Sequence, residues 1–443
     1  MAKEKIQFFC TNCGHEERKW QGKCPNCGEW NSFSEQKVSK TSKGTEVKSV
    51  TSLPLSEIQI EESYRYTTNI KEVDQVLGGG LMKGSSVLIG GEPGIGKSTL
   101  LLQIADSISK NHKVIYVSGE ESANQIKIRA TRLNIKGEGI SILCNSHFET
   151  IIESIKTQKP ELVIIDSIQT LQSDEAGNIP GSVNQLKYCC SHLIQAVKEI
   201  EASIFFIAHV TKEGVIAGPK VVEHMVDTVL YFDHSASQIR ILRSVKNRFG
   251  SIDEVGLFSM EERGLIELKD PSGVFLTKRE SGLPPGIAIG ATLEGTRVIL
   301  IEIQILTVPA KGVSSRIISD NVDPNRVSRV AAILEKHGGL KFSDRDIYVN
   351  IAGGIKVKET GIDLPLALAL YSSRTDLPLK DGIISSGELS LAGEIRNVPH
   401  IERRVKTAED MGFKLFISPG NVKKTSLEIR EVDTIKKAIS QIL

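Results

Sequence analysis

The stretch Gly-Glu-Pro-Gly-Ile-Gly-Lys-Ser at residues 91–98 restricts the possible folds more than any other feature of the sequence. It follows the strand-like residues 87–89 and precedes a helix-forming run that starts at Thr99. Glycines let a backbone wrap around a phosphate, and the N-terminus of the following helix attracts negative charge. Strand, loop and helix match the Walker A pattern, in which the lysine reaches the β and γ phosphates of ATP and the serine ligates Mg²⁺. The residues predicted to bind the nucleotide are Gly91, Glu92, Pro93, Gly94, Ile95, Gly96, Lys97, Ser98 and Thr99.

Apolar runs that alternate with helical stretches predict the sheet that carries this loop. The strand-like runs cover residues 86–90, 114–118, 162–165 and 204–208. Because strands that alternate with helices are typical of a parallel sheet, we expect an α/β fold in this part of the chain.

Polar side chains at the ends of these runs are candidates for the chemistry of hydrolysis. Asp166 follows an apolar run and fits a Walker B aspartate that holds Mg²⁺ through water, or else an ordinary strand-ending carboxylate. Glu120 is expected to orient the attacking water. Glu121 is the alternative, and both could equally be solvated acids at the start of a helix. His209 is expected to sense the γ-phosphate, with a purely structural histidine as the alternative.

The segment 211–220 contains Lys212, Lys220 and two glycines, a composition suited to a loop that contacts a phosphate backbone. A plain surface loop is the alternative. Because the formal net charge of the chain is only +1, DNA binding would have to depend on local basic patches.

Four of the seven cysteines form two Cys-x-x-Cys pairs near the N-terminus, each followed by a glycine. Two such pairs present four thiolates to a tetrahedral Zn²⁺, and a segment this short has no core that would fold it otherwise. A redox dithiol, which needs only one pair, is the alternative. The predicted zinc ligands are Cys10, Cys13, Cys24 and Cys27. Cations and an aromatic residue accompany them, namely Arg18, Lys19, Trp20 and Lys23. Such a surface suits contact with nucleic acid or equally with protein.

Composition divides the 443 residues into three domains and two linkers. Residues 1–33 form the cysteine finger, and the polar residues 34–60 form a linker. The ATPase core covers residues 61–270. A second linker at 271–286 is rich in proline and glycine, which break helices and inner strands. Residues 287–443 are expected to form a compact α/β domain.

The sequence predicts a protein of the cytoplasm. No apolar run approaches the roughly 18 residues that a membrane span needs. The first residues show no apolar region of a secretory signal, and paired cysteines in a reducing compartment favour metal binding over disulfides.

Over essentially its full length the chain resembles the bacterial RadA (Sms) family of RecA-related DNA-repair ATPases. Four parts carry the resemblance in the family's order. They are the two cysteine pairs, the run Leu-Gly-Gly-Gly-Leu at residues 77–81 that leads into the Walker A loop, the run Lys-Asn-Arg-Phe-Gly at residues 246–250, and a C-terminal region that is similar to the Lon protease domain.

This resemblance implies a ring-shaped hexamer that loads on single-stranded DNA at recombination intermediates. It further implies that the ring drives branch migration with ATP, as a DNA-dependent ATPase or helicase, and works with the RecA recombinase on branched DNA. In RecA-like hexamers, cations at the positions of Lys246 and Arg248 act across the subunit interface on the neighbour's γ-phosphate. Their spacing after the strand-like residues 239–242 would point both at one face. A basic turn that contacts solvent or DNA is the alternative.

The Lon-like region departs from the protease at the two positions that matter for peptide cleavage. The resemblance places the nucleophilic serine at Asp363 and its partner lysine at Arg404. A carboxylate and a guanidinium cannot replace an activated hydroxyl and a deprotonatable amine. We therefore expect a non-proteolytic scaffold for ring assembly and duplex DNA. The candidate DNA contacts are Lys341, Arg345, Lys356 and Lys358, for which a solvated charged face is the rival interpretation.

Three functions are compatible with this organisation. The first is an ATP-driven DNA motor, and the second is a RecA-like regulatory ATPase that acts on protein partners. The cysteine finger and the 246–250 run argue against the second, and DNA-stimulated hydrolysis would discriminate the two. The third, an ATP-dependent protease, is disfavoured by Asp363 and Arg404.

Overall fold

The computed structural model divides the chain into two compact units, and each is described by itself. The first comprises Met1–Asp233 with Ile241–Glu267, and the second His234–Arg240 with Leu268–Leu443. The structure describes residues 5–10, 15–38, 54, 56, 64–177, 181–209, 217–234, 239–268, 275–277, 279, 282–312, 315–420, 422 and 425–442.

The N-terminal finger is a small antiparallel sheet with the cysteines at one end. Strand β1 (Lys5–Cys10) lies between β2 (Glu16–Glu17) and β3 (Phe33–Val38). The register pairs Cys10 with Phe33 and Lys5 with Val38, so β3 runs five residues into the segment predicted to be a linker. Apolar and polar residues do not alternate clearly along β3, so the sequence gives little indication of its length, which its pairing with β1 determines.

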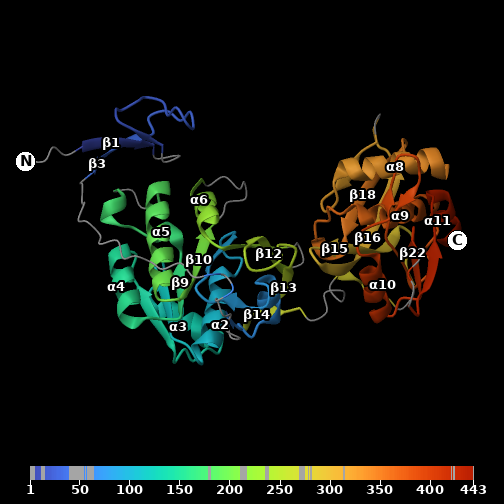
Figure 1. Cartoon of the computed structure of the whole chain (residues 1–443). Helices are drawn as coiled ribbons and strands as arrows, with labels where there is room; N and C mark the ends of the chain where they lie inside the picture. Colours follow the sequence, from blue (N-terminus) through green and yellow to red (C-terminus); the bar gives the residue numbers. More distant parts are fainter. Residues whose placement is uncertain are drawn as a thin grey trace, which may run out of the picture. The chain divides into compact units, whose positions relative to one another are not determined.

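The centre of the first unit is a sheet of nine strands among the described residues, in the order β14-β13-β12-β11-β6-β10-β9-β7-β8 (Figure 1). Parallel pairing connects β11, β6, β10, β9, β7 and β8, as the alternating sequence pattern predicts. The strands are β6 (Ser86–Gly91), β7 (Val114–Ser118), β8 (Ile140–Cys144), β9 (Leu162–Asp166), β10 (Ser203–His209), β11 (Thr228–His234), β12 (Ile239–Asn247), β13 (Val255–Glu261) and β14 (Gly264–Glu267). The four strand-like runs of the sequence are confirmed as β6, β7, β9 and β10.

Helices cover both faces of this sheet, and alternate residues of each inner strand point into two separate cores. Val87 and Ile89 of β6 belong to one core with α2, whereas Leu88 belongs to the other with α5. Both faces are therefore closed to water, so the polar side chains needed for chemistry collect at the strand ends. The helices are α1 (Lys71–Val76), α2 (Lys97–Ser109), α3 (Ala123–Arg132), α4 (Phe148–Gln158), α5 (Val183–Glu199) and α6 (Ala217–Met225).

The glycine run 77–81 and the turn at 246–250 pack against each other. A Cβ added to Gly78 would lie 3.0 Å from the Cα of Gly250, and one added to Gly250 would lie 2.9 Å from the Cα of Gly78. Arg65, in the short strand β4 (Arg65–Tyr66) that pairs with β5 (Leu81–Met82), donates to the carbonyl oxygens of Gly80 at 2.8 Å and Phe249 at 2.7 Å. The two motifs therefore form one structural element beside the end of β12.

The second unit is a mixed sheet of seven strands among its described residues, in the order β17-β18-β16-β15-β19-β22-β23. The strands are β15 (Ile287–Glu294), β16 (Arg297–Pro309), β17 (Ile317–Ser319), β18 (Arg345–Ile351), β19 (Ile383–Ser385), β22 (Leu415–Ser418) and β23 (Glu428–Glu431), with a separate hairpin of β20 (Glu388–Leu389) and β21 (Ile395–Arg396). The helices are α8 (Pro324–Gly338), α9 (Asp363–Thr375), α10 (Ile401–Asp410) and α11 (Ile435–Ile442). The compact α/β domain expected after residue 287 is confirmed as a fold, and the full set of expected domain boundaries stays a prediction.

Candidate nucleotide-binding site and metal centre

The glycine-rich loop joins β6 to α2 and leaves space for a phosphate. Gly96 is the N-cap of α2 and has φ 116°, a left-handed conformation that favours glycine. A Cβ on Gly96 would lie only 2.7 Å from Cε of Met260. A Cβ added to Gly94 would have no atom within 4 Å among the described residues. The loop is thus packed on one side and open on the other, where the N-terminus of α2 can attract an anion.

Lys97 is buried at this loop, with 3 % of its surface exposed. Its Nζ donates to the carbonyl oxygens of Gly91 at 2.7 Å and Glu92 at 2.9 Å. Burial lowers the pKa of Lys97 to about 8, although the charges of Asp166 and Glu120 act in the opposite direction. Carbonyl oxygens are weaker partners for an ammonium than phosphate oxygens are. The lysine is therefore held where a bound phosphate would stabilise its charge.

A cavity of about 710 Å³ opens in front of the loop, a volume within the usual range for small-ligand sites. Its lining residues are Gly94, Gly96, Lys97, Ser98, Thr99, Arg129, Arg132, His209, Met260, Glu261 and Glu262. Arg129 and Arg132 of α3 and the β13–β14 turn were not predicted from the sequence. The two arginines lie three positions apart on a helix, a common surface pattern, so only the tertiary fold identifies them as lining residues.

Asp166 ends β9 beside the equivalent end of β7, where Ser118 is its partner in register. Its side chain is buried, and Oδ2 accepts a hydrogen bond from the Tyr116 hydroxyl at 2.5 Å. Burial and the nearby Asp166 charge raise the pKa of Tyr116 well above its ordinary value, so the phenol stays a donor. This hydroxyl fixes the carboxylate without neutralising it.

The two adjacent glutamates have different surroundings. Glu120 accepts from the Ser167 hydroxyl at 2.6 Å and lies 3.7 Å from Nε2 of His209. Glu121 instead forms an ion pair with Arg129. Glu120 is therefore next to His209, and its charge acts on Lys97, whereas Glu121 is engaged by Arg129.

His209 ends β10 next to Gly91 of β6 and lines the cavity. Burial, and then the charge of Lys97, lowers the pKa of His209, which keeps the ring neutral near pH 7. Its Nδ1 has no hydrogen-bond partner in the described part of the chain, and its carbonyl oxygen accepts from Nε2 of Gln169 at 3.2 Å. Lys212 lies outside the described residues. Lys220 on α6 is exposed.

Lys246 and Arg248, the two cations of the 246–250 run, differ in the hydrogen-bond partners of their side chains and in how far Arg248 is exposed. The Nζ of Lys246 donates to the carbonyl oxygens of Glu223, His224 and Val226, at 2.9, 3.2 and 2.7 Å, around the end of α6. The side chain of Arg248 is 58 % exposed, and its Nη1 lies 3.3 Å from Oδ1 of Asp227. Arg248 is therefore the more accessible of the two for a phosphate from outside the chain.

Three of the four predicted zinc ligands meet at one end of the finger. The Sγ atoms of Cys10, Cys24 and Cys27 lie within 4.8 Å of one another, and those of Cys10 and Cys27 are 3.6 Å apart. Zn–S bonds of about 2.3 Å in a tetrahedron separate sulfurs by about 3.8 Å, so the donors fit zinc. The amide of Gly28 donates to the carbonyl oxygen of Cys24 at 2.9 Å, which turns the chain so that Cys27 faces Cys24. Cys13 lies outside the described residues.

Asp363 and Arg404 do not form a pair in the second unit. Arg404 is fully buried and donates to the Glu359 carboxylate and to the carbonyl oxygens of Ala291 and Pro399. Asp363 begins α9, lies 3.8 Å from Nε of Arg326, and its pKa is raised to about 6 by burial. These two positions therefore have separate structural partners and no shared site for acyl transfer.

The candidate DNA contacts of the second unit are mostly on its surface. Lys341 is exposed, and Lys356 and Lys358 are exposed on either side of buried Val357. Arg345 is half-buried at the start of β18.

Among the described residues, no helix has the length and apolar character to cross a membrane.

Three family models match separate parts of the chain, in the order that the fold shows. Residues 8–35 match the rubredoxin metal binding domain, residues 66–142 match the KaiC ATPase, and residues 319–421 match subunit ChlI of Mg-chelatase. The chain is thus an α/β protein with an N-terminal zinc ribbon, a RecA-like ATPase core and a C-terminal domain similar to ChlI and Lon.

Relatives match the chain over nearly the whole of both sequences. The chain is 49 % identical to the DNA repair protein RadA of Treponema pallidum over 100 % of its own length and 99 % of that protein. It is 43 % identical to RadA of Bacillus subtilis over 99 % of each chain, and 40 % identical to RadA of Pseudomonas aeruginosa over 100 % of each. With the family resemblance of the sequence confirmed in this way, the chain belongs to the RadA family of DNA repair proteins.

Proposed function

We propose that this protein is a DNA-dependent ATPase that works as a motor on single-stranded and branched DNA during homologous recombination. The observation that carries the proposal is the meeting of Lys97, Glu120, Asp166 and His209 at the carboxyl ends of four neighbouring parallel strands, beside a nucleotide-sized cavity. The names of the relatives support a role in DNA repair. Branch migration, helicase action and cooperation with the RecA recombinase, in the cytoplasm, are the finer parts of the proposal.

Residues of one subunit would bind the nucleotide. Lys97 and the amides of the loop hold the β and γ phosphates, and Glu120 orients the attacking water. Ser98 and Asp166 offer a hydroxyl and a carboxylate, which suit Mg²⁺. When bound, this ion would neutralise charge on the phosphates. His209 senses the γ-phosphate through its ring, and it lies three residues before Lys212 in the sequence.

A neighbouring subunit would complete the site in a homohexameric ring. Arg248 is exposed enough to reach a neighbour's γ-phosphate, where a guanidinium stabilises the charge of phosphoryl transfer. Lys246 would have to leave three carbonyl partners to do the same, so we assign the leading role to Arg248. Lys212, Lys220, Lys246 and Arg248 are also the proposed DNA contacts of this unit.

The decisive measurement is the steady-state ATPase rate with and without single-stranded DNA across a salt series. Stimulation that fades as salt rises is expected of a motor that binds phosphates. Arg248→Ala should keep nucleotide binding and lose stimulated turnover, while Lys187→Ala, on the exposed face of α5, should change neither. An absence of stimulation at low salt would favour the regulatory ATPase that acts on protein partners.

A further inference from the structure

Both tryptophans of the chain lie in the finger and are exposed to solvent. Trp20 is 55 % exposed and Trp30 is 67 % exposed. Tryptophan is highly buried on average, and exposed apolar surface on a small domain commonly marks a binding site. Neither ring contributes to the finger's core, which comprises Cys10, Cys24 and Phe33 with Phe8 packed against it. The metal centre therefore does not account for the position of these rings.

The two indole rings both lie next to Gly22. A Cβ built on Gly22 would be 3.8 Å from Cη2 of Trp20 and 3.8 Å from Cζ3 of Trp30. The backbone brings Trp30 next to Gly22, because Lys23 pairs with Trp30 in an antiparallel bridge and the amide of Asn31 donates to the carbonyl oxygen of Gly22 at 2.7 Å. Trp30 thus lies on the hairpin that contains Cys24 and Cys27, and Trp20 lies two residues before Gly22. Because this backbone is ordered before a ligand binds, less conformational entropy would be lost on binding.

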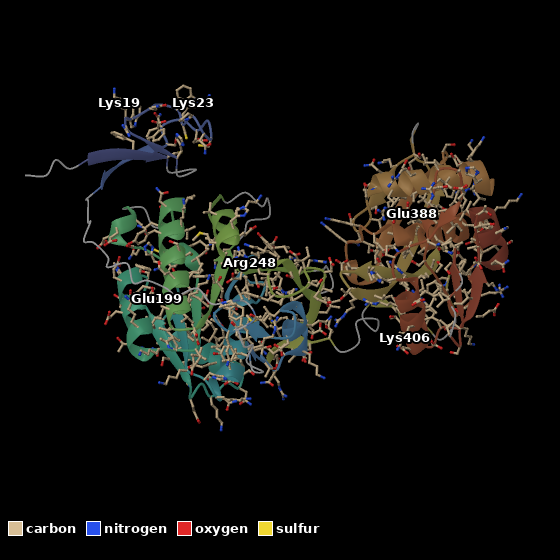
Figure 2. All side chains as sticks on the ribbon, in the orientation of Figure 1. Lys19, Lys23, Glu199, Arg248, Glu388 and Lys406 are labelled. Carbon is tan, nitrogen blue, oxygen red and sulfur yellow. The ribbon has the colours of Figure 1, made fainter. Side chains whose placement is uncertain are left out.

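Positive charge accompanies the rings. Nζ of Lys23 lies 5.5 Å from the centroid of the Trp30 ring, and Arg18 and Lys19 are exposed. Residues 18–28 contain these three cations and no Asp or Glu. Figure 2 shows Lys19 and Lys23 on the loops of the finger, away from its strands β1 and β3. Exposed aromatic faces next to cations are the combination that binds single-stranded nucleic acids, since bases stack on the rings and phosphates meet the charges.

We propose that Trp20, Trp30, Arg18, Lys19 and Lys23 form an indole platform on which unpaired bases of single-stranded DNA stack. Base faces are inaccessible inside a duplex, so the platform discriminates single strands from duplexes without reading sequence. It would give the chain a second contact with DNA, separate from the ATPase core. The inference deepens the proposed function and depends on it, because it names how the finger engages the same polymer.

Intrinsic fluorescence tests this directly, because every tryptophan of the zinc-loaded, full-length protein is in the platform. Titration with oligothymidylate should quench the indole emission, since a stacked base quenches the ring. An abasic oligomer of the same length carries the phosphates without bases and should quench much less. Trp20→Phe and Trp30→Phe leave one emitter each and report on the two rings separately. Equal quenching by both oligomers would overturn stacking.

Affinity measurements provide the second test. Anisotropy of a labelled oligothymidylate should show about 5-fold or more weaker binding for Trp20→Ala or Trp30→Ala, the lower end of what one stacked base contributes. Gly22→Val keeps both rings and places a branched side chain against them, so it should also weaken binding. Zinc content must stay equal to wild type in each variant. Unchanged affinity in all three would overturn the platform.

These experiments distinguish a failure of the indole platform from a failure of the proposed function. If wild-type protein binds the labelled oligomer and its ATPase is stimulated, yet the tryptophan emission does not change, the platform is wrong and the proposed motor stands. If DNA neither binds nor stimulates turnover at low salt, the proposed function fails and the platform fails with it. Emission that changes only when a protein partner is added would reassign the rings to protein contact.

Discussion

Lys97 in the ATPase core and Arg404 in the C-terminal domain are both buried cations, with 3 % and 0 % of their surfaces exposed. Their partners differ. Lys97 donates to two backbone carbonyl oxygens, and no carboxylate of the described residues hydrogen-bonds to its ammonium. Arg404 is paired with the carboxylate of Glu359 and also donates to Ala291, Ser386 and Pro399.

The difference separates a charge kept for a ligand from a charge that holds a fold. Asp166 and Glu120 lie near Lys97, but their carboxylates accept hydrogen bonds from the hydroxyls of Tyr116 and Ser167. The carboxylates of Asp166 and Glu120 are thus near the ammonium of Lys97 without forming a hydrogen bond to it, and the ammonium lies beside an open cavity. At Arg404 the planar guanidinium has a carboxylate and several acceptors in reach, so there is no capacity left for substrate.

The largest effect is expected from Lys97→Ala. Loss of a charge that stabilises the transferred phosphate should lower ATP turnover by about 100-fold or more, by analogy with removal of one donor to a developing anion. The free energy of unfolding should fall little, because the lysine has only carbonyl partners. Lys110→Ala, at the exposed end of the same helix α2, is the matched control for turnover and for stability. Turnover within a few-fold of wild type would remove Lys97 from the proposed mechanism.

Arg404→Met should show the reverse pattern. Removing one partner of a buried ion pair leaves Glu359 uncompensated and costs about 3–5 kcal/mol. We expect urea unfolding and hydrogen exchange of α10 to report this loss, while ATP turnover per folded molecule stays near wild type at low temperature. Arg403→Met, an exposed neighbour on α10, should be nearly neutral. Arg404→Met combined with Glu359→Gln should recover part of the stability; if instead Arg404→Met alone is neutral, the pair does not hold the fold.

The sequence predicted those parts of the site that depend on residues close together in the chain. The Walker A loop, Asp166 and the cysteine pairs are local patterns whose chemistry follows from spacing. Arg129 and Arg132 could not be found in this way, because only packing of α3 brings them to the cavity. The partner of Arg404 is equally hidden, since Glu359 is 45 residues away in sequence.

An edge strand and several contacts between distant residues were also not predicted. Strand β8 was not predicted, although four of its five residues are apolar, because its apolar run is short and is interrupted by Ser141. It lies at the edge of the sheet, where all five residues are half-buried or exposed. The carbonyl partners of Lys246 lie at the end of a helix about two dozen residues earlier, which spacing alone cannot reveal. Neither spacing nor composition indicates that the rings of Trp20 and Trp30 both lie next to Gly22.

The smallest expected effect is a pH dependence of nucleotide affinity that comes from Lys97. Burial lowers its pKa from the ordinary value of 10.5 to about 8, so its charge costs stability below pH 8, and this cost is released as the pH rises from 8 towards 10.5. Bound phosphates should raise the pKa again, because opposite charges favour the ammonium. ATP binding above pH 8 must then take up a proton, and affinity should fall by up to about 10-fold per pH unit.

Calorimetry in two buffers of different ionisation enthalpy measures that proton uptake. Wild-type protein should take up about half a proton per ATP at pH 8, where a group with that pKa is half protonated before binding. Lys97→Arg keeps its charge throughout this range and should show no uptake from this position. Arg404 does not line the cavity, so Arg404→Met should leave the proton uptake unchanged, which would confine the effect to the cation at the cavity. An affinity for ATP that is constant from pH 7 to pH 9 in wild type would mean that Lys97 is already fully charged before the nucleotide arrives.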